Sequence, residues 1–228
     1  MQSRKIVFVI VEGPSDEDAL GVLFNRIYIK ETVYVEVMHC DITTEKNATP
    51  SNIVAKVCDI VKRYAGRQFR PNDFARIIHI VDTDGAFVPA DAVIEDPEKQ
   101  KPFYTGTAIY TRNKSGIEAR NQRKGENLRR LSSTSTIWNI PYQIYYMSCN
   151  LDHALYGKQN SSDVDKQRDS MCFAERYGDD IPSFLTFISD SEFSVKSEYR
   201  QSWQYIQEGL HSLERHTNLG VCFSNKTE

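Results

Sequence analysis

The chain alternates between short, wholly apolar runs and longer amphipathic stretches. Residues 5–11, 74–81 and 142–147 are short runs rich in Val, Ile, Phe and Tyr, which is typical of strands buried on both faces of a parallel sheet. Residues 32–38 are rich in Val and Tyr in a less regular pattern, and we interpret them as a further strand.

Between and after these runs, apolar residues recur at spacings of three and four, which indicates one face of a helix. One such stripe follows Ser15 or Asp16, either of which can cap a helix, and further helices are predicted at 51–64, 163–178, 180–189 and 197–215. The alternation of strands and helices predicts an α/β fold, Rossmann-like, with a mainly parallel sheet flanked by helices and a C-terminal helical extension.

A change of composition separates two parts of the chain's middle. Residues 86–104 hold three prolines among charges, which predicts loop or short irregular structure. Residues 112–130 then hold seven basic and two acidic side chains, in a chain whose net charge is -3. We expect the basic residues to contact nucleic-acid phosphates, a solvated charged face being the alternative. They are Arg112, Lys114, Arg120, Arg123, Lys124, Arg129 and Arg130.

Length and cysteine usage set the broad class. With 228 residues and 40% hydrophobic content, we expect a core over 1–160, with a basic insertion at about 86–135, and a helical extension over 161–228. The five cysteines are scattered and form no C-x-x-C pair, which argues against disulfides and structural zinc. We find no apolar run of membrane-spanning length, so we expect a cytoplasmic protein without a membrane partner.

Acidic residues follow several of the predicted strands. Glu12 comes after the first, Asp82 and Asp84 after the third, and Asp152 just past the fourth. The carboxyl ends of parallel strands share one edge of a sheet, so we expect these carboxylates to converge. A lone acid before glycine is commonly a turn former, but crowded carboxylates favour a cation such as Mg²⁺ or Mn²⁺. Asp16, in the first helical turn, adds another candidate ligand.

Two segments carry a resemblance to a known family. FVIVEGPSDEDAL at 8–20 and IIHIVDTDG at 77–85 resemble the Toprim domain. The resemblance implies a Toprim fold in which Glu12 is the acid/base or first metal ligand and Asp82 and Asp84 ligate Mg²⁺. NLDHAL at 150–155 resembles the later acidic helix of the overcoming-lysogenisation-defect (OLD) nucleases. That similarity implies that Asp16 and Asp152 hold a second ion.

The same similarity to OLD nucleases implies a catalytic role for Lys158, which would stabilise charge. It also implies a Mg²⁺-dependent nuclease acting on DNA or RNA, in phage defence with a separate ATPase. The alternative is a non-catalytic Toprim-fold regulatory or binding subunit. A receiver domain fits less well, because it needs paired acids at the first strand end and only Glu12 is there.

Other side chains leave alternatives open. His153, beside Asp152, is either a proton-transfer group or a solvent-facing helix residue, whereas His79 lies in an apolar run and is expected in the core. The apolar stripe of 197–215, with Trp203 and Ile206, either covers the sheet or binds a partner. That partner would be a second copy of the chain or the ATPase.

Overall fold

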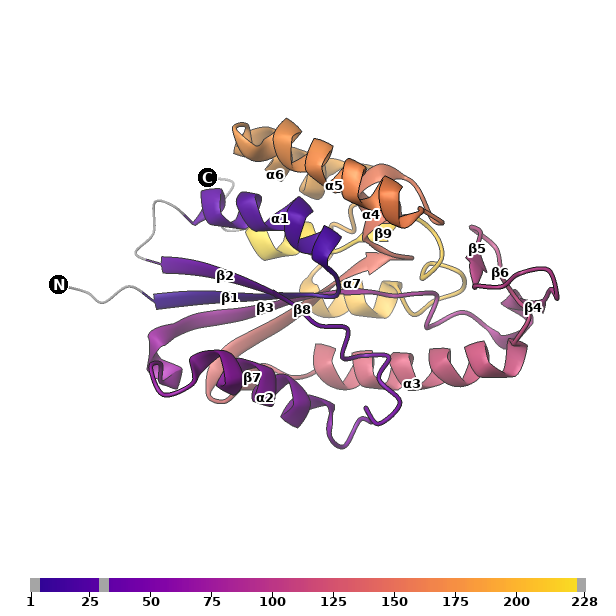
Figure 1. Ribbon diagram of the computed structural model, residues 1–228, viewed down its shortest axis with the longest axis horizontal. Coiled ribbons are helices and arrows are strands. Elements are labelled where there is room, and N and C mark those ends of the chain that lie inside the picture. The colour runs from indigo at the N-terminus through magenta and orange to yellow at the C-terminus, as the bar shows by residue number, and fades with distance from the viewer. Residues whose placement is uncertain (1–4, 29–32, 225–228) are drawn as a thin grey trace.

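The computed structural model describes residues 5–28 and 33–224 of the chain, which form an α/β fold (Figure 1). The central sheet is mainly parallel, with strands in the order β2-β1-β3-β8-β7 and with β9 pairing to β8. Its parallel strands are β1 (Lys5–Val11), β2 (Val33–His39), β3 (Phe74–Asp82) and β8 (Ile140–Ser148), while β7 (Thr136–Ile137) and β9 (His216–Thr217) pair antiparallel to β8. The predicted sheet is therefore confirmed, in an arrangement compatible with a Rossmann-like fold.

Helices cover both faces of this sheet (Figure 1). One face carries α1 (Pro14–Ile27), α4 (Leu151–Tyr156), α5 (Asp163–Gly178), α6 (Ile181–Asp190) and the 3₁₀ helix η3 (Leu219–Phe223). The other face carries α2 (Ile53–Ala65), α3 (Lys114–Ser132) and α7 (Tyr199–Tyr205). Two short 3₁₀ turns, η1 (Pro71–Asp73) and η2 (Ala90–Ala92), complete the helical segments. Every helix within the described ranges is too short or too polar to cross a bilayer.

The two-sided burial follows from the alternation of side chains along each strand. In β1, Phe8 and Ile10 pack into the core beneath α2 and α3, whereas Val7 and Val9 pack beneath α1. All of these side chains are at most 1% exposed, which explains why the run is apolar at every position. A strand that is buried on both faces cannot show an alternating pattern.

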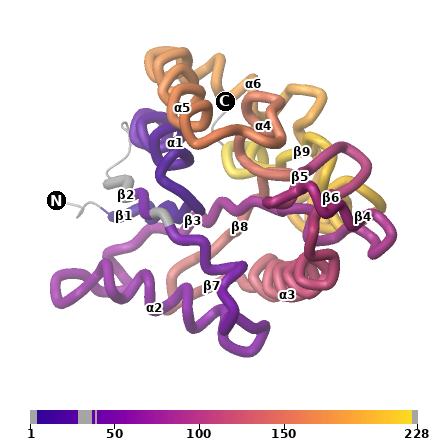
Figure 2. The backbone as a smooth tube through the Cα atoms, turned by 45° about the vertical axis from the view of Figure 1, so that its right-hand side comes forward, coloured from indigo at the N-terminus to yellow at the C-terminus, as the bar shows by residue number. Residues whose placement is uncertain are grey.

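The segment at 86–111 is more ordered than the sequence predicted. Strands β4 (Val93–Glu95), β5 (Phe103–Tyr104) and β6 (Ile109–Thr111) form a separate three-stranded sheet beyond the carboxyl ends of the main strands (Figure 2). The prolines that suggested irregular structure lie outside these short strands, where they cost no ladder hydrogen bond. The prediction of a loop was therefore wrong where the strands form.

The helix predicted at 197–215 was also wrong over most of its length. Only α7 is helical there, and the chain continues as turns that include Gly209, whose φ is 51°. Several carbonyls after this point accept hydrogen bonds from side chains at the end of the sheet instead of from a helix. The Ser148 hydroxyl donates to the carbonyls of His211 and Glu214, each at 2.8 Å. Tertiary hydrogen bonds have replaced the helical ladder in this segment.

The apolar stripe in this region belongs to the core. Trp203 is 3% exposed and Ile206 is fully buried, and the Trp203 indole donates to the carbonyl of Ile144 in β8 at 3.1 Å. Trp203 also packs edge-on against Tyr146. The stripe therefore covers the sheet, and the surplus apolar face suggested for a partner does not exist at these residues.

We predict that Trp203→Ala lowers the free energy of unfolding by about 3–5 kcal/mol, because it removes a large buried ring and leaves the Ile144 carbonyl without its donor. Met171→Ala is the matched control, since Met171 is 51% exposed, and it should change stability by no more than about 0.5 kcal/mol. Urea denaturation of both variants measures the difference. Equal effects would contradict the placement of Trp203.

Candidate functional site

Acidic side chains meet at the carboxyl edge of the parallel sheet. Glu12 directly follows β1, Asp82 ends β3, and Asp84 lies two residues further on. Because β1 and β3 are parallel neighbours, these carboxylates influence one another's protonation, as the sequence led us to expect. Asp41, which follows β2, joins them. Glu12, Asp41 and Asp82 line one cavity of about 470 Å³.

The start of α1 places Asp16 in the same cavity. The helix is capped at Gly13, with Pro14 as its first residue, so Ser15 and Asp16 are not the cap. Instead the Asp16 carboxylate accepts the backbone N–H of Gly13 at 3.0 Å. This bond directs the acid back toward the end of β1.

Asp82 and Asp152 are linked through the start of α4. The Asp82 carboxylate accepts the backbone N–H of Leu151 at 2.8 Å, which joins the end of β3 to the first turn of that helix. Asp152 follows directly, and its side chain is 5% exposed. The helix start is capped by the Asn150 side chain.

The turn after β3 is strained and tightly packed. Asp84 has a φ of 49° and Gly85 a φ of 68°, a left-handed conformation that costs a residue with a side chain about 1 kcal/mol. A Cβ on Gly85 would lie 2.8 Å from Ile109, so only glycine fits there. Arg120 donates to the Asp84 carbonyl at 2.8 Å, and Asp84 N–H donates to the Cys149 carbonyl at 2.7 Å. These contacts fix the Asp84 carboxylate.

A lysine ammonium lies between two of the acids. Lys124 Nζ of α3 is 2.5 Å from Asp84 Oδ2 and 3.3 and 3.5 Å from the two carboxylate oxygens of Glu12. The Lys124 side chain is fully buried, and the Glu12 side chain is 10% exposed. The sequence predicted Lys124 as a nucleic-acid contact, but the structure places it inside, bound to protein carboxylates.

These charges tune one another. Burial raises the pKa of Glu12 to about 8, although Lys124 opposes the shift. Burial alone would raise the pKa of Asp84, but Lys124 and Arg120 hold it below its ordinary value. Burial would also lower the pKa of Lys124, yet Asp84 and Glu12 raise it. We therefore regard Lys124 and Asp84 as the charged pair, with Glu12 as a group that holds its proton near neutral pH.

A second lysine faces the remaining acids. Lys166 of α5 lines the cavity, is 40% exposed, and places Nζ 3.7 Å from Asp152 Oδ2. Burial raises the pKa of Asp16 to about 6 and raises that of Asp152. The pKa of Asp82 lies well above its ordinary value, because the carboxyl is buried and is close to Glu12 and Asp16.

The acids thus form two sets. We call Glu12 and Asp84, which contact Lys124, the first carboxylate pair. We call Asp16, Asp82 and Asp152, whose charges all act on Lys166, the second carboxylate group. One set has a buried counterion and the other has a partly exposed one.

The two sets differ in their fit to a metal ion. Across residues 5–28 and 33–224, no three Asp, Glu, His or Cys side chains already enclose a metal position. The first carboxylate pair does not fit an ion, because the Lys124 ammonium fills the space between the two acids. The second carboxylate group offers only oxygen donors, which suits Mg²⁺ or Mn²⁺. Metal binding by these acids stays a prediction.

Lys158 does not belong to the acidic site. Its ammonium pairs with Asp169 at 2.5 Å, its side chain is 47% exposed, and it does not line the cavity. The lysine that lines the cavity and contacts Asp152 is Lys166, eight residues later in the sequence. The position of Lys158 therefore does not support the charge-stabilising role that the resemblance implied.

The basic segment forms α3, and its charges point in different directions. Arg112, Arg129 and Arg130 are exposed, so they remain candidates for phosphate contacts. Lys114 pairs with Glu118 at 3.9 Å on the same helix. The remaining members face the protein: Arg120 donates to Asp84 and Tyr104, Arg123 to the Thr44 carbonyl, and Lys124 to the first carboxylate pair.

Sequence reasoning missed the inward role of Lys124, together with Asp41 and Lys166. A signal for the first was present, because Ile117, Asn121, Lys124, Leu128 and Leu131 are spaced as one helical face and are all buried. A lysine within that stripe was hidden by the many charges around it. Asp41 followed a strand of irregular pattern, and nothing in the sequence distinguished Lys166.

His79 and His153, the two histidines considered from the sequence, both make contacts within the fold and lie outside the acidic cavity. His79 is fully buried and its ring bonds to the Tyr142 hydroxyl at 2.9 Å, in agreement with the predicted core position. Burial lowers the pKa of His153 to about 4, so its ring is neutral at pH 7 and accepts the N–H of Cys149 at 3.4 Å. His153 does not line the acidic cavity.

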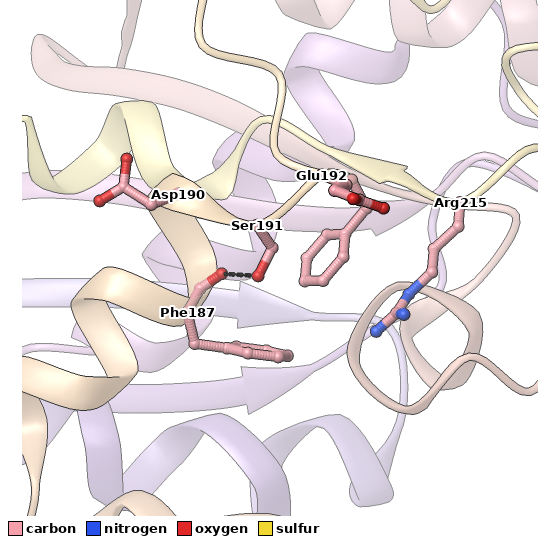
Figure 3. A pocket seen from close by; sticks show the side chains of 6 residues that line it. Phe187, Asp190, Ser191, Glu192 and Arg215 are labelled. Carbon is pink, nitrogen blue, oxygen red and sulfur yellow. Dashed lines mark hydrogen bonds between the residues drawn. The ribbon is translucent and has the colours of Figure 1, made fainter.

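A separate hollow of about 620 Å³ shares no lining residue with the acidic cavity (Figure 3). It is lined by Phe187, Asp190, Ser191, Glu192, Phe193 and Arg215. The Arg215 guanidinium lies 4.2 Å from the centre of the Phe193 ring and donates to the last carbonyls of α4. Arg215 therefore serves to satisfy the carbonyls at the C-terminal end of α4.

Comparisons of the chain with protein-family models, with curated proteins and with solved structures found no match. The resemblance to Toprim domains therefore rests on the short motifs around Glu12, Asp82 and Asp152.

We predict that the protein loses stability as pH rises from 6 to 8. The folded state raises the pKa of Glu12 from 4.5 to about 8, so it holds a proton that the unfolded chain releases. The stability from that proton is complete below pH 4.5 and is lost as pH rises through about 8. The slope for one such group is about 1.4 kcal/mol per pH unit.

Glu12→Gln, which stays neutral, should show a smaller loss over this range, whereas Glu126→Gln on the exposed face of α3 should behave as the unaltered protein. Chemical denaturation at several pH values measures the slopes. The same slope with and without Glu12 would show that its carboxyl is ionised throughout.

Proposed function

We propose that the chain is a divalent-metal-dependent nuclease that hydrolyses phosphodiester bonds in DNA or RNA. The observation that carries the proposal is the meeting of Glu12, Asp82 and Asp84 at the ends of adjacent parallel strands. Glu12 and Asp82 line an open cavity there, which Asp16 also lines. Buried carboxylates that repel one another are costly to fold, and a cation relieves that cost. Phosphodiester hydrolysis is a reaction in which such cations serve.

Each part of the site has a task in this reaction. Asp16, Asp82 and Asp152 would hold Mg²⁺ or Mn²⁺, which supplies charge neutralisation and an activated water when bound. Glu12, with a pKa of about 8, is matched to proton transfer near neutral pH. Lys166 lines the cavity and is partly exposed, so its ammonium can meet a phosphate oxygen.

The exposed part of α3 suits the flanking nucleic acid. Arg129 and Arg130 are exposed near the end of the helix, and Arg112 is exposed just before its start. Guanidinium groups there would neutralise phosphates beside the one that is cleaved, without reading sequence. The negative overall charge of -3 means that attraction depends on such local residues.

The biological setting is proposed on two grounds. A role in phage defence beside a separate ATPase is supported by the resemblance to OLD-type nucleases alone, and a cytoplasmic setting is supported by the scattered cysteines. The apolar stripe that the sequence offered as a docking face is occupied by the core at Trp203 and Ile206.

The second candidate is a non-catalytic subunit of the same fold that binds nucleic acid or a partner. The position of Lys124 favours it, because an ammonium between Glu12 and Asp84 is a complete structural use for both acids. Binding without cleavage would be its signature.

We predict that the protein cleaves labelled single-stranded DNA, duplex DNA or transfer RNA only with Mg²⁺ or Mn²⁺, and that EDTA stops the reaction. Asp82→Asn should abolish cleavage, and Glu12→Gln should slow it by about 100-fold or more, since it removes the proton-transfer group. Asp190→Asn is the control, because Asp190 is exposed and pairs only with Lys196 among the described ion pairs. Nucleic-acid binding without cleavage in any metal would favour the second candidate.

We also predict that Arg129→Glu with Arg130→Glu weakens duplex binding and flattens its salt dependence. Each lost phosphate contact should reduce the slope of log affinity against log salt by about 0.9. Lys196→Glu removes an exposed charge elsewhere and should leave the slope unchanged. Fluorescence anisotropy over a range of salt concentrations measures it, and identical slopes would return α3 to the solvated-face alternative.

A further inference from the structure

The space between Glu12 and Asp84 already contains a cation. Lys124 Nζ is within 3.5 Å of both carboxylates, and Mg²⁺ that bridged them would need oxygens at about 2.0–2.1 Å. An ion at that spacing would have to occupy the space that the Lys124 ammonium fills. A second positive charge beside it would be repelled in a buried setting.

Lys124 is held where it is by the whole of its helix. Two other residues of the helix bind the surrounding segments: Arg120 donates to the Asp84 carbonyl, and Asn127 donates to the carbonyls of Thr43 and Ala48. A Cβ on Gly125 would lie 3.1 Å from the Ala86 carbonyl, so the helix backbone approaches closely. The ammonium cannot move aside without leaving the buried Asp84 carboxylate without this partner.

We propose that Lys124 is a built-in cation that excludes a divalent ion from the first carboxylate pair, so that the acidic cavity binds one ion fewer than its carboxylates would otherwise hold. The ion that the proposed nuclease needs would then bind only at Asp16, Asp82 and Asp152. This inference rests on the proposed function for the kind of ion. The exclusion itself rests on the contacts of Lys124.

The test is a titration of the full chain with Mn²⁺, with free ion followed by electron paramagnetic resonance. Lys124→Met keeps the length of the side chain and removes its charge, and it should bind one more Mn²⁺ per chain than the unaltered protein. Lys124→Arg keeps the charge and should bind the same number as the unaltered protein. Lys196→Met, which removes an exposed lysine that pairs with Asp190 and does not line the acidic cavity, is the matched control.

A double variant locates the additional ion. Lys124→Met with Asp84→Asn removes one of the two carboxylates that would hold it, so the extra Mn²⁺ should be lost again. Where Lys124→Met folds poorly alone, Mn²⁺ should raise its melting temperature by more than it raises that of the unaltered protein, because the ion binds only the folded state.

The proposal is judged by the difference between variants. Equal Mn²⁺ binding by the unaltered protein and Lys124→Met, with no added stabilisation by Mn²⁺, would overturn it. The proposed function is judged separately, by cleavage and by the value for the unaltered protein. If the unaltered protein bound no Mn²⁺ and Lys124→Met bound one, exclusion by Lys124 would stand and the metal-dependent nuclease would fall.

Discussion

The buried ammonium of Lys124 is the contact on which the arrangement of the site depends. A lysine and two acids removed from water each carry a large desolvation cost, and their mutual attraction offsets it only while the geometry holds. Lys124 takes its position from α3, Glu12 from the end of β1 and Asp84 from the turn after β3. None of these elements can shift alone without breaking a contact of the buried ammonium.

The rest of the fold supports the strained turn at Asp84. The buried Thr83 hydroxyl donates to the carbonyl of Ser212 at 2.8 Å, and Gly85 leaves room for only a hydrogen atom beside Ile109 and Leu213. The turn is therefore enclosed by the small sheet and by the segment after α7, both distant in sequence. A left-handed aspartate persists where its surroundings determine it this strongly.

The sequence predicted the main strands and the meeting of their acids, because buried parallel strands leave continuous apolar runs and end at a common edge. It did not predict the inward position of Lys124, because a lysine in a charged helix resembles a surface residue until its stripe is recognised. It also failed at 197–215, where apolar spacing indicated a helix. There the carbonyls of His211, Ser212 and Glu214 bond to side chains near the sheet end, an outcome that periodicity does not record.

The two lysines divide the acids into a set with a permanent counterion and a set with an exchangeable one. Lys124 is fully buried, makes a short contact with Asp84 and also contacts Glu12, so it acts as a fixed component of the fold. Lys166 is 40% exposed, and its ammonium lies 3.7 Å from Asp152, which is long for an ion pair. Water, a phosphate or a cation can therefore displace it at much lower cost. The second carboxylate group, Asp16, Asp82 and Asp152, therefore has a desolvation cost that Lys166 offsets only in part. Acids left in that condition favour an incoming cation, whereas Glu12 and Asp84 do not, and chemistry at this edge of the sheet would begin at the second carboxylate group.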